Sequence, residues 1–432
     1  MRRIPLVRLL KPGTAGLIAL LALMGLTTAI GRPGTTGATA SSALAAAAQQ
    51  LSVASTGTSL DNWSLSAPVP ASQYDNADIV PGILTADGYT WEIYGDGTTW
   101  HRLRGTSVDN LVELPPAAYN TAALPFPHAL AGCADDHYWP EGLWSDGTTW
   151  YTTVHVEFGF FDLAHGVSTC LPTDAPYAAG HHFRLIGLAT STDLGASWSW
   201  AGTIVSSADS YNVQSYPGTY FDWGDGDQRL LVDPRSGYFY LYYKTGWVNK
   251  TDASTYDLYQ TIRVARSPIS AKMAPGSWQK WYDGSWSQPG IGGLDSDVFR
   301  GEDSAAVFYS AYLGQYVAFG NYPSFIATAT NLTTQNWTWP KAFTDASSPA
   351  QLQWYNWVVD PATGDPMTMS GRTFRLYSAD DYNASQYACA ACAPAHYTVV
   401  TLNGGGAPAT LLPVAVYPPE SVPSRLPEWE WD

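Results

Sequence analysis

Short runs rich in β-branched and aromatic residues follow one another along the chain, separated by turns that contain glycine. The clearest pair joins Leu230–Val232 to the aromatic run Tyr238–Tyr243 through the turn at 233–237. Such runs are typical of β-strands, and this turn composition is typical of a hairpin. No long segment with the 3.6-residue period of an amphipathic helix appears after residue 45. The pattern therefore predicts an all-β protein.

Four further hairpins follow from the same pattern. Each pairs two short apolar runs across a turn that contains glycine. They span residues 79–94 with the turn Asp87-Gly88, 142–156 with Asp146-Gly147, 305–319 with Leu313-Gly314, and 357–369 with a turn at 360–364. Because the unit recurs along the chain, we interpret the hairpins as internal repeats.

A second signature recurs after the hairpins, at the end of a third predicted strand. It contains Thr or Arg, a small residue and then, in most copies, Asp or Asn and Leu, with a tryptophan after the clearest copies. The copies lie at 190–198, 266–278 and 328–337, with weaker ones at 106–111 and 377–380. A hairpin, a third strand and a Trp-bearing outer strand make a four-stranded antiparallel sheet. Five such sheets predict an all-β, five-bladed β-propeller, whereas stacked β-sandwich domains would repeat roughly every 100 residues.

Residues 191–198, Ser-Thr-Asp-Leu-Gly-Ala-Ser-Trp, also match the Asp-box pattern S-x-D-x-G-x-S/T-W. In this turn we expect Asp193 to accept hydrogen bonds from backbone N–H groups and Trp198 to pack between strands. The motif is a structural marker found on propellers of several functions, so it does not by itself indicate catalysis.

The first 45 residues are predicted to lie outside the propeller. Basic residues near the N-terminus precede the apolar segment Leu17–Ile30 of 14 residues, which is short for a membrane span. Small residues follow, as at a signal-peptide cleavage site. We therefore expect 1–45 to be a signal peptide and linker and 46–432 a single catalytic propeller domain. The mature protein would be secreted and extracellular, without stable membrane insertion; an uncleaved membrane anchor is the alternative.

The charge of the chain limits its partners. The formal net charge is −16, and removal of residues 1–45 takes away five basic residues and no acidic one, which leaves −21. Such a surface repels phosphate backbones, so we expect no nucleic-acid binding, and we expect a monomer. Aromatic residues reach 14%, with 19 tryptophans. In an exported protein this indicates a carbohydrate partner whose ring faces stack on aromatic rings, although sheet cores account for most of these residues.

The four cysteines, an even number in a predicted exported chain, indicate disulfide bonds. Three pairings are open, and we favour Cys133 with Cys170 and Cys389 with Cys392. Zinc or redox chemistry fits less well, because the compartment is oxidising and no second ligand pair lies near the Cys-x-x-Cys motif.

Propeller geometry predicts where functional side chains meet. The innermost strand of each blade begins on one face near the axis, and its hairpin partner returns to that face. Residues at these positions therefore converge, and four of the five blades carry a carboxylate at the first of them. The candidates are Asp78, Glu141, His155, Glu157, Asp227, Arg229, Glu302 and Asn356, with Trp139, Trp223 and Trp354 near the same face as stacking platforms for a sugar.

Clustered carboxylates repel one another, and the usual reasons to hold them together are a metal or acid–base chemistry. Glycoside hydrolysis needs one carboxylic acid kept protonated and one carboxylate as base or nucleophile. Crowding raises one pKa and leaves the other low, which separates the two roles. The pattern therefore favours a glycosidase.

The layout resembles the five-bladed propeller glycoside hydrolases of the arabinanase/xylosidase superfamily. The resemblance rests on Asp78-Ile79-Val80-Pro81 in the first blade, Trp139-Pro140-Glu141 in the second and Asp227 in the third. It implies Asp78 as base or nucleophile, Glu141 as the residue that tunes a pKa, and Asp227 as general acid. Two features depart from the family pattern: the third-blade acid is Asp where Glu is usual, and His155-x-Glu157 is extra. Glu157 is therefore an alternative partner for Glu141, and Asp222 and Asp225 are alternatives to Asp227.

These observations predict a secreted hydrolase that cleaves glycosidic bonds of a neutral poly- or oligosaccharide, with arabinofuranose as a candidate sugar. The main alternative is a non-catalytic carbohydrate-binding propeller. A sialidase-like enzyme fits less well, because Phe183-Arg184-Leu185-Ile186 does not supply the expected Arg-Ile-Pro motif. No cofactor and no metal are expected in the reaction, while Ca²⁺ in the central channel stays open.

Overall fold

The computed structural model describes the propeller in segments. They are 80–95, 99–117, 137–158, 183–208, 220–222, 224–249, 258–300, 305–320, 325–342, 355–378 and 396–402, with four short strands before them. All lie in the compact unit Ala45–Asp432. The unit Met1–Leu44 lies outside the described residues, so the signal peptide and the boundary at residue 45 stay predictions. No helix in the described part of the chain is long and apolar enough to cross a membrane.

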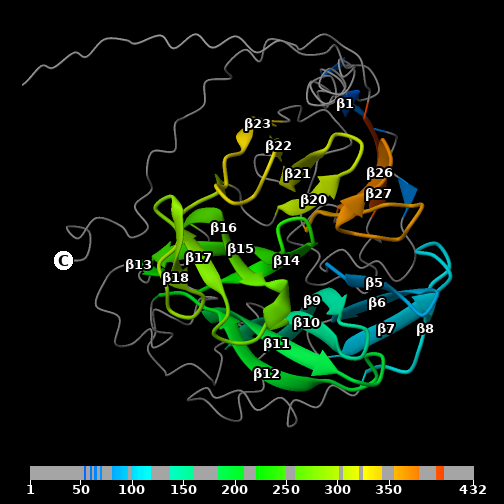
Figure 1. The fold of residues 1–432 in the computed structure, drawn as a ribbon, viewed down its shortest axis with the longest axis horizontal. Helices are drawn as coiled ribbons and strands as arrows, with labels where there is room; N and C mark the ends of the chain where they lie inside the picture. Colours follow the sequence, from blue (N-terminus) through cyan, green and yellow to red (C-terminus); the bar gives the residue numbers. More distant parts are fainter. Residues whose placement is uncertain are drawn as a thin grey trace, which may run out of the picture. The chain divides into compact units, whose positions relative to one another are not determined.

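Five sheets in these segments follow one another around a common centre, which confirms the five-bladed propeller (Figure 1). The first blade has the order β5-β6-β7-β8, with β5 (Gly82–Ala86), β6 (Tyr89–Gly95), β7 (Trp100–Gly105) and β8 (Val112–Glu113). The second contains β9 (His137–Ser145), β10 (Trp150–Phe158), β11 (Phe183–Ser191) and β12 (Ser199–Val205). Both are antiparallel meanders.

The third blade is larger. Its long strand β15 (Tyr238–Asn249) pairs with β14 (Gly226–Asp233) on the inner side and also with β13 (Tyr220–Asp222). Outward follow β16 (Leu258–Pro268), β17 (Gln279–Tyr282) and β18 (Ser285–Pro289), while β19 (Phe299–Arg300) pairs with β16. The fourth blade contains β20 (Ala306–Ser310), β21 (Gln315–Gly320), β22 (Phe325–Ala329) and β23 (Thr338–Ala342).

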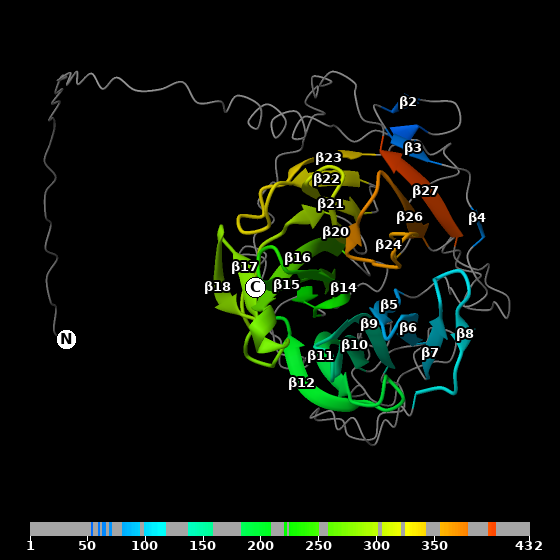
Figure 2. The same cartoon turned by 45° about the vertical axis from the view of Figure 1, so that its right-hand side comes forward.

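The fifth blade draws on both ends of the described chain. Its order is β24 (Trp357–Val359), β26 (Thr373–Ser378), β27 (His396–Leu402) and β3 (Trp63–Leu65), and β4 (Val69–Pro70) also pairs with β27. Figure 2 shows β3 alongside β27. The outer edge of the last blade is therefore completed by residues that precede the first blade. Two other short strands, β1 (Val53–Ala54) and β2 (Ser59–Leu60), pair with each other and with no further strand in the described part of the chain.

The prediction for this blade was wrong in its second strand. Residues 367–369 are not the hairpin partner of 357–359, because β25 (Thr368–Met369) pairs in parallel with β20 of the fourth blade. The true partner is β26. The weak signature at 377–380 consequently begins at the end of a second strand and not a third. The other four hairpins, and the signature copies in the first four blades, lie where they were predicted.

The hydrophobic core is divided among the interfaces between neighbouring blades. One cluster joins the first two blades through Trp91, Trp100, Trp150 and Trp198, with Trp91 and Trp150 edge-to-face at 5.1 Å. Comparable clusters fill the remaining four interfaces. Much of the excess of aromatic residues is used here, because large flat rings fill the wedge between sheets that splay outward.

The Asp-box forms the expected turn between β11 and β12. Asp193 Oδ1 accepts a hydrogen bond from the backbone N–H of Ser197 at 2.9 Å, and Ser197 Oγ donates to Asp193 Oδ2 at 2.6 Å. Trp198 is buried in the core between the first two blades. The motif therefore has a structural role.

Candidate active site

Two of the predicted carboxylates lie at irregularities in innermost strands. In β9, the register against β10 shifts beside Glu141, where Gly142 adopts a left-handed backbone with φ +86°. In β14, the register against β15 shifts between Gly226 and Arg229, and Asp227 adopts φ +48°. Such bulges redirect side chains and are common near active sites.

Asp227 occupies a backbone conformation that favours glycine. A left-handed conformation costs a non-glycine residue roughly 1–2 kcal/mol. The carboxylate is consequently held at a cost in backbone strain, which is often found at functional sites.

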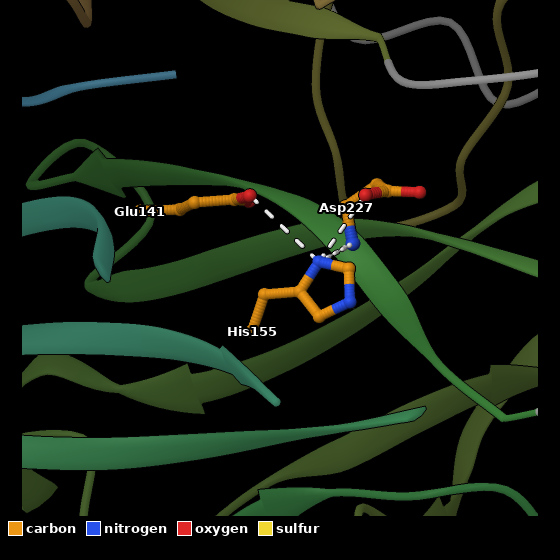
Figure 3. Close-up of side chains that lie close together, drawn as sticks. All are labelled: Glu141, His155 and Asp227. Atoms are coloured by element: carbon orange, nitrogen blue, oxygen red, sulfur yellow. Dashed lines mark hydrogen bonds and ion pairs between the residues drawn. The ribbon is translucent and has the colours of Figure 1, made fainter. Parts of the chain in front are cut away.

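The carboxylates of Glu141 and Asp227 meet at His155, which β10 contributes (Figure 3). His155 Nδ1 lies 3.2 Å from Asp227 Oδ1 and 3.8 Å from Glu141 Oε1. One ligand-type atom from each of the three residues lies within 4.8 Å of the others. All three side chains are buried, with exposed fractions of 5% for Glu141 and 2% for Asp227 and His155.

Cross-strand pairing in the second blade adds a further carboxylate and its counter-ion. Glu157 follows His155 on the same strand face, two residues along β10, and lies directly opposite Arg184 of β11. Arg184 Nε lies 3.1 Å from Glu157 Oε1, and Arg184 Nη1 donates to Asp227 Oδ2 at 3.0 Å. Glu157 Oε1 also lies 3.4 Å from His155 Nε2. Arg184 therefore joins the second blade to the third.

Two more cations come from the third blade. Lys244 Nζ lies 3.5 Å from Asp227 Oδ2, and Arg229 Nη1 lies 3.4 Å from Glu141 Oε2. Arg229 Nε also donates to the backbone oxygen of Asn356 at 3.1 Å. These contacts connect the third blade to the segment that leads into β24.

Tyr355 lies over this group and is half-buried. Its hydroxyl lies 3.5 Å from Asp227 Oδ1, and the Arg229 guanidinium lies 5.7 Å from its ring centroid. Its backbone is also left-handed, with φ +53°. A bulky residue in this conformation is an outlier, so the fold holds the ring against this group despite local strain.

The surroundings of the two acids move their pKa values in opposite directions. Burial raises the pKa of Glu141, and this outweighs the opposing influence of His155 and Arg229. Burial also acts to raise the pKa of Asp227, but Arg184, Lys244 and His155 hold that pKa well below its ordinary range. Glu141 is thus favoured as the protonated acid and Asp227 as the ionised carboxylate. The resemblance implied other roles, with Asp227 as the general acid and Glu141 as a residue that tunes a pKa.

His155 is subject to two opposing influences. Burial lowers its pKa, but Asp227 and the neighbouring glutamates raise it well above the ordinary value. The backbone N–H of Asp227, however, donates to Nδ1 at 2.9 Å, which fits the neutral ring with its proton on Nε2. Protonation at Nδ1 would break that contact. The position of the Asp227 backbone and the charge of His155 are therefore coupled.

A small cavity of about 40 Å³ lies on the axis, between inner strands of all five blades. Its lining is mostly apolar, and its polar side chains are Gln228 and Arg229. Calcium takes six to eight oxygen ligands, with carboxylates usual among them, and the side chains of this lining offer no carboxylate and one amide oxygen beside a guanidinium. The possible Ca²⁺ in the central channel does not fit this lining. The carboxylates of Glu141 and Asp227 already have Arg184, Arg229 and Lys244 as counter-charges, so their negative charge does not call for a metal ion.

The structure brings together six of the predicted site residues: Glu141, His155, Glu157, Asp227, Arg229 and Asn356. Trp139 is half-buried and packs against Tyr94 and Leu103. Asp78, Glu302, Trp223 and Trp354 lie outside the described residues, as do all four cysteines. Their roles and the disulfide pairing stay predictions.

Sequence reasoning missed Arg184 and Tyr355 as site residues. Arg184 is the second residue of a third strand, whereas the prediction considered only the first two strands of each blade. Its pairing with Glu157 follows from hairpin register once the ends of β10 and β11 are known. Tyr355 stands between two residues that were selected, and no local signal marks its left-handed backbone.

No protein-family model and no curated protein sequence matches this chain. Among solved structures, it is similar to a xylan beta-1,4-xylosidase from Bacillus halodurans C-125, with 10% identity, a TM-score of 0.40 and coverage of 76% of this chain and 54% of that one. It is also similar to a family 117 glycoside hydrolase from the marine bacterium Zobellia galactanivorans, with 9% identity, a TM-score of 0.43 and coverage of 79% and 92%. A third is an endo-arabinase from Bacteroides thetaiotaomicron, with 10% identity, a TM-score of 0.38 and coverage of 79% and 98%.

The chain spans about half the length of the xylosidase. These three solved structures are glycoside hydrolases by their names. At these identities and TM-scores, the likeness does not indicate an activity for this chain. The assignment of the fold rests on the five sheets themselves.

Proposed function

We propose that this chain is a glycoside hydrolase in which Glu141 is the proton donor and Asp227 the ionised carboxylate. The observation that carries the proposal is a pair of buried carboxyl groups, held within 4.8 Å of each other, whose pKa values are displaced in opposite directions. One group that keeps its proton and one that has lost it are what glycosidic cleavage requires. The proposal therefore differs from the roles that the resemblance implied, in which Asp227 was the general acid, Glu141 tuned a pKa and Asp78 was the base or nucleophile.

The substrate proposed is a neutral poly- or oligosaccharide, with arabinofuranose as a candidate sugar. The acidic chain, with a net charge of −16, would repel a strongly anionic polymer at long range. We also propose that the protein is secreted and acts on this substrate outside the cell as a monomer. Neither step of acid–base cleavage calls for a metal, so we expect activity to persist in EDTA.

The carboxylate spacing makes a stereochemical prediction. Retaining enzymes hold the two groups about 5–5.5 Å apart, whereas inverting enzymes leave about 6.5–9.5 Å for a water molecule. One carboxylate oxygen of Glu141 lies within 4.8 Å of one of Asp227, which is nearer to the first arrangement than to the second. If these two residues act as the pair, the product keeps the anomeric configuration of the substrate. Inversion would require a third carboxylate as base, for which Asp78 is the candidate.

The test is sugar release from arabinans, xylans, fructans and galactans by the full chain and by Glu141→Gln and Asp227→Asn. A folded variant of either kind should lose at least a hundredfold in rate. Glu113→Gln is the matched control, because Glu113 lies on β8 and pairs with His101 away from the site. NMR of the first product then gives the anomer. The proposal would be overturned if the parent releases sugar and both the Glu141→Gln and Asp227→Asn variants release it at the same rate.

One observation favours a non-catalytic sugar-binding propeller as the second candidate. Glu141 and Asp227 are almost completely buried, and a catalytic pair must meet its substrate. Under this alternative the ion pairs would only fix the shape of a binding face. Retention on one immobilised glycan without sugar release from any member of the panel would favour it.

A further inference from the structure

A second group of buried charges lies in the third blade, behind the segment that carries Asp227. Its centre is Lys280 of β17, whose exposed fraction is 0%. Lys280 Nζ donates to Asp225 Oδ2 at 2.9 Å and to Asp295 Oδ2 at 2.8 Å. Its third acceptor is the backbone oxygen of Ser206, in the second blade, at 2.9 Å. The ammonium group thus has an acceptor for each of its three protons.

Asp295 is itself fixed by neighbouring strands. Tyr243 of β15 donates its hydroxyl proton to Asp295 Oδ2 at 2.7 Å. Arg263 of β16 donates to the Asp295 backbone oxygen at 2.9 Å and pairs with its carboxylate. Arg263 Nη2 also lies 2.8 Å from Asp297 Oδ1. The acceptors of Lys280 therefore have little freedom to move, and Asp225 is held at a defined place.

Asp225 lies two residues before Asp227, and the residues around it leave no room for adjustment. Gly224 forms a parallel bridge with Arg184, and a Cβ atom on Gly224 would lie 2.0 Å from the Arg184 backbone oxygen. A Cβ on Gly226 would lie 2.8 Å from His155 Nε2. The glycines let the chain pass against Arg184 and His155, two of the residues that contact the Asp227 carboxylate.

We propose that Lys280, Asp225 and Asp295 are positioning residues that hold Asp227 in its strained place between Arg184, Lys244 and His155. The proposal rests on the function proposed above for Asp227. Buried ion pairs contribute little net stability, since the loss of hydration offsets their attraction. Three directed hydrogen bonds nevertheless fix a position more sharply than apolar packing does. Asp227 needs that precision, because its backbone conformation is unfavourable without support.

The expected consequence is electrostatic. The pKa of Asp227 stays low because Arg184 and Lys244 lie within 3.0 and 3.5 Å of its Oδ2. If the Asp225 anchor is weakened, Asp227 moves away from these cations and its pKa rises. The backbone N–H of Asp227 also moves away from His155 Nδ1. Both effects are measurable without any change to a residue that contacts Asp227.

Asp225→Asn is the principal variant. The asparagine keeps the size of the side chain and an oxygen acceptor for Lys280. Burial raises the pKa of Asp225 to about 6 despite the attraction of Lys280, so the loss of its charge should cost less stability than the loss of a carboxylate whose pKa is lowered. Lys280→Met is the more severe variant, because it leaves two buried carboxylates without this cation. Lys272→Met is the matched control, since Lys272 is 54% exposed and pairs with Asp146 in a surface turn.

Two measurements are made on the full chain. In the pH profile of kcat/KM, the acidic limb of Asp225→Asn should move up by at least one pH unit, with kcat reduced tenfold or more and KM changed less than twofold. In ¹⁵N NMR of the histidine side chains, with His155 assigned by its loss in His155→Gln, the Nδ1 and Nε2 shifts of His155 should change. Lys272→Met should leave the pH profile and the His155 shifts unchanged.

The proposal is overturned if folded Asp225→Asn keeps the parent's His155 shifts. It is also overturned if the acidic limb stays in place while the enzyme is active. The NMR result does not depend on sugar release. Failure of the parent on every glycan would therefore count against the proposed function alone, and the His155 shifts would still decide whether Asp225 positions Asp227. If Lys280→Met does not fold, Asp225→Asn decides.

Discussion

Replacement of Arg184 by methionine tests whether this side chain keeps Asp227 ionised. The guanidinium lies 3.0 Å from Asp227 Oδ2 and 3.1 Å from Glu157 Oε1, and all three side chains are buried. Methionine keeps the apolar stem and removes the charge. The variant should therefore lose the ion pairs with little loss of packing.

The magnitude follows from two general values. An opposite charge within 4–6 Å lowers a carboxyl pKa by about 1–3 units, so the pKa of Asp227 should rise by that amount. Each unit corresponds to about 1.4 kcal/mol. The loss of one partner from a buried ion pair costs about 3–5 kcal/mol in total, a large part of the roughly 5–15 kcal/mol that stabilises a typical domain.

The sign of the pH dependence follows from the lowered pKa. A group whose pKa is lower in the folded state stabilises the fold above its unfolded pKa of about 3.9, and this contribution is lost as the pH falls toward the folded value. In the parent, Asp227 is such a group. The difference in unfolding free energy between parent and Arg184→Met should consequently be largest above about pH 5 and should shrink toward pH 2.

The assay is urea unfolding followed by tryptophan fluorescence at several pH values from 2 to 7. Arg235→Met is the control, because Arg235 is 43% exposed and lies 3.9 Å from Asp233; such pairs contribute about 0–1 kcal/mol. A parent–variant difference for Arg184→Met that stays constant across this range would refute the reasoning. The cost would then come from packing or hydrogen bonding and not from the ionisation of Asp227.

Four further outcomes are expected. Activity should fall as the pH rises through the raised pKa of Glu141, because the ionised group cannot donate a proton; a flat pH–rate profile would contradict this. Gly142→Ala should lower stability by about 1–3 kcal/mol in urea unfolding, since its φ is +86° and its Cβ would lie 2.7 Å from Leu230 Cβ; an unchanged midpoint would argue against it. Phe308→Ala should lower the unfolding free energy by about 3–5 kcal/mol in the same assay, because the Phe308 ring is buried against Phe319 and Phe374. A loss below about 1 kcal/mol would show that the neighbouring side chains collapse into the cavity. Removal of residues 1–70 should expose the edge of β27 and cause self-association visible by size-exclusion chromatography, whereas a soluble monomer of the same stability would contradict that expectation.

The fold could be predicted from sequence wherever pairing is local. Turns such as Asp87-Gly88 and Asp146-Gly147 lie between strands that are adjacent in the chain, so periodicity and turn chemistry sufficed for four hairpins. The prediction failed for the fifth blade because the strand pairings there are not local. Thr368 pairs in parallel with a strand of the preceding blade, and Val400 pairs with Leu65. No short-range signal in the sequence specifies either contact.

The same limit applied to the site. Glu141, His155 and Asp227 could be selected because strand position in a propeller predicts convergence. The protonation states of Glu141 and Asp227 could not be predicted from the sequence, because they depend on cations that other strands contribute. Arg184 reaches Asp227 from β11, and Lys244 reaches it from β15. A resemblance transfers positions along the chain, but the charges around those positions must be taken from three-dimensional contacts.

The pairing of β3 with β27 has a consequence for how the molecule assembles. The first three blades contain only strands that follow one another in the chain, so each can form as soon as its own residues are available, whereas the fourth also pairs with β25, which follows β24. The fifth needs residues from both sides of the other four, and its closing contact has the longest sequence separation among the described strand pairs. Contacts of long separation form late and slowly. Until β27 has been synthesised, β3 and β4 have no strand to pair with, and the sheet of the fifth blade lacks its outer half.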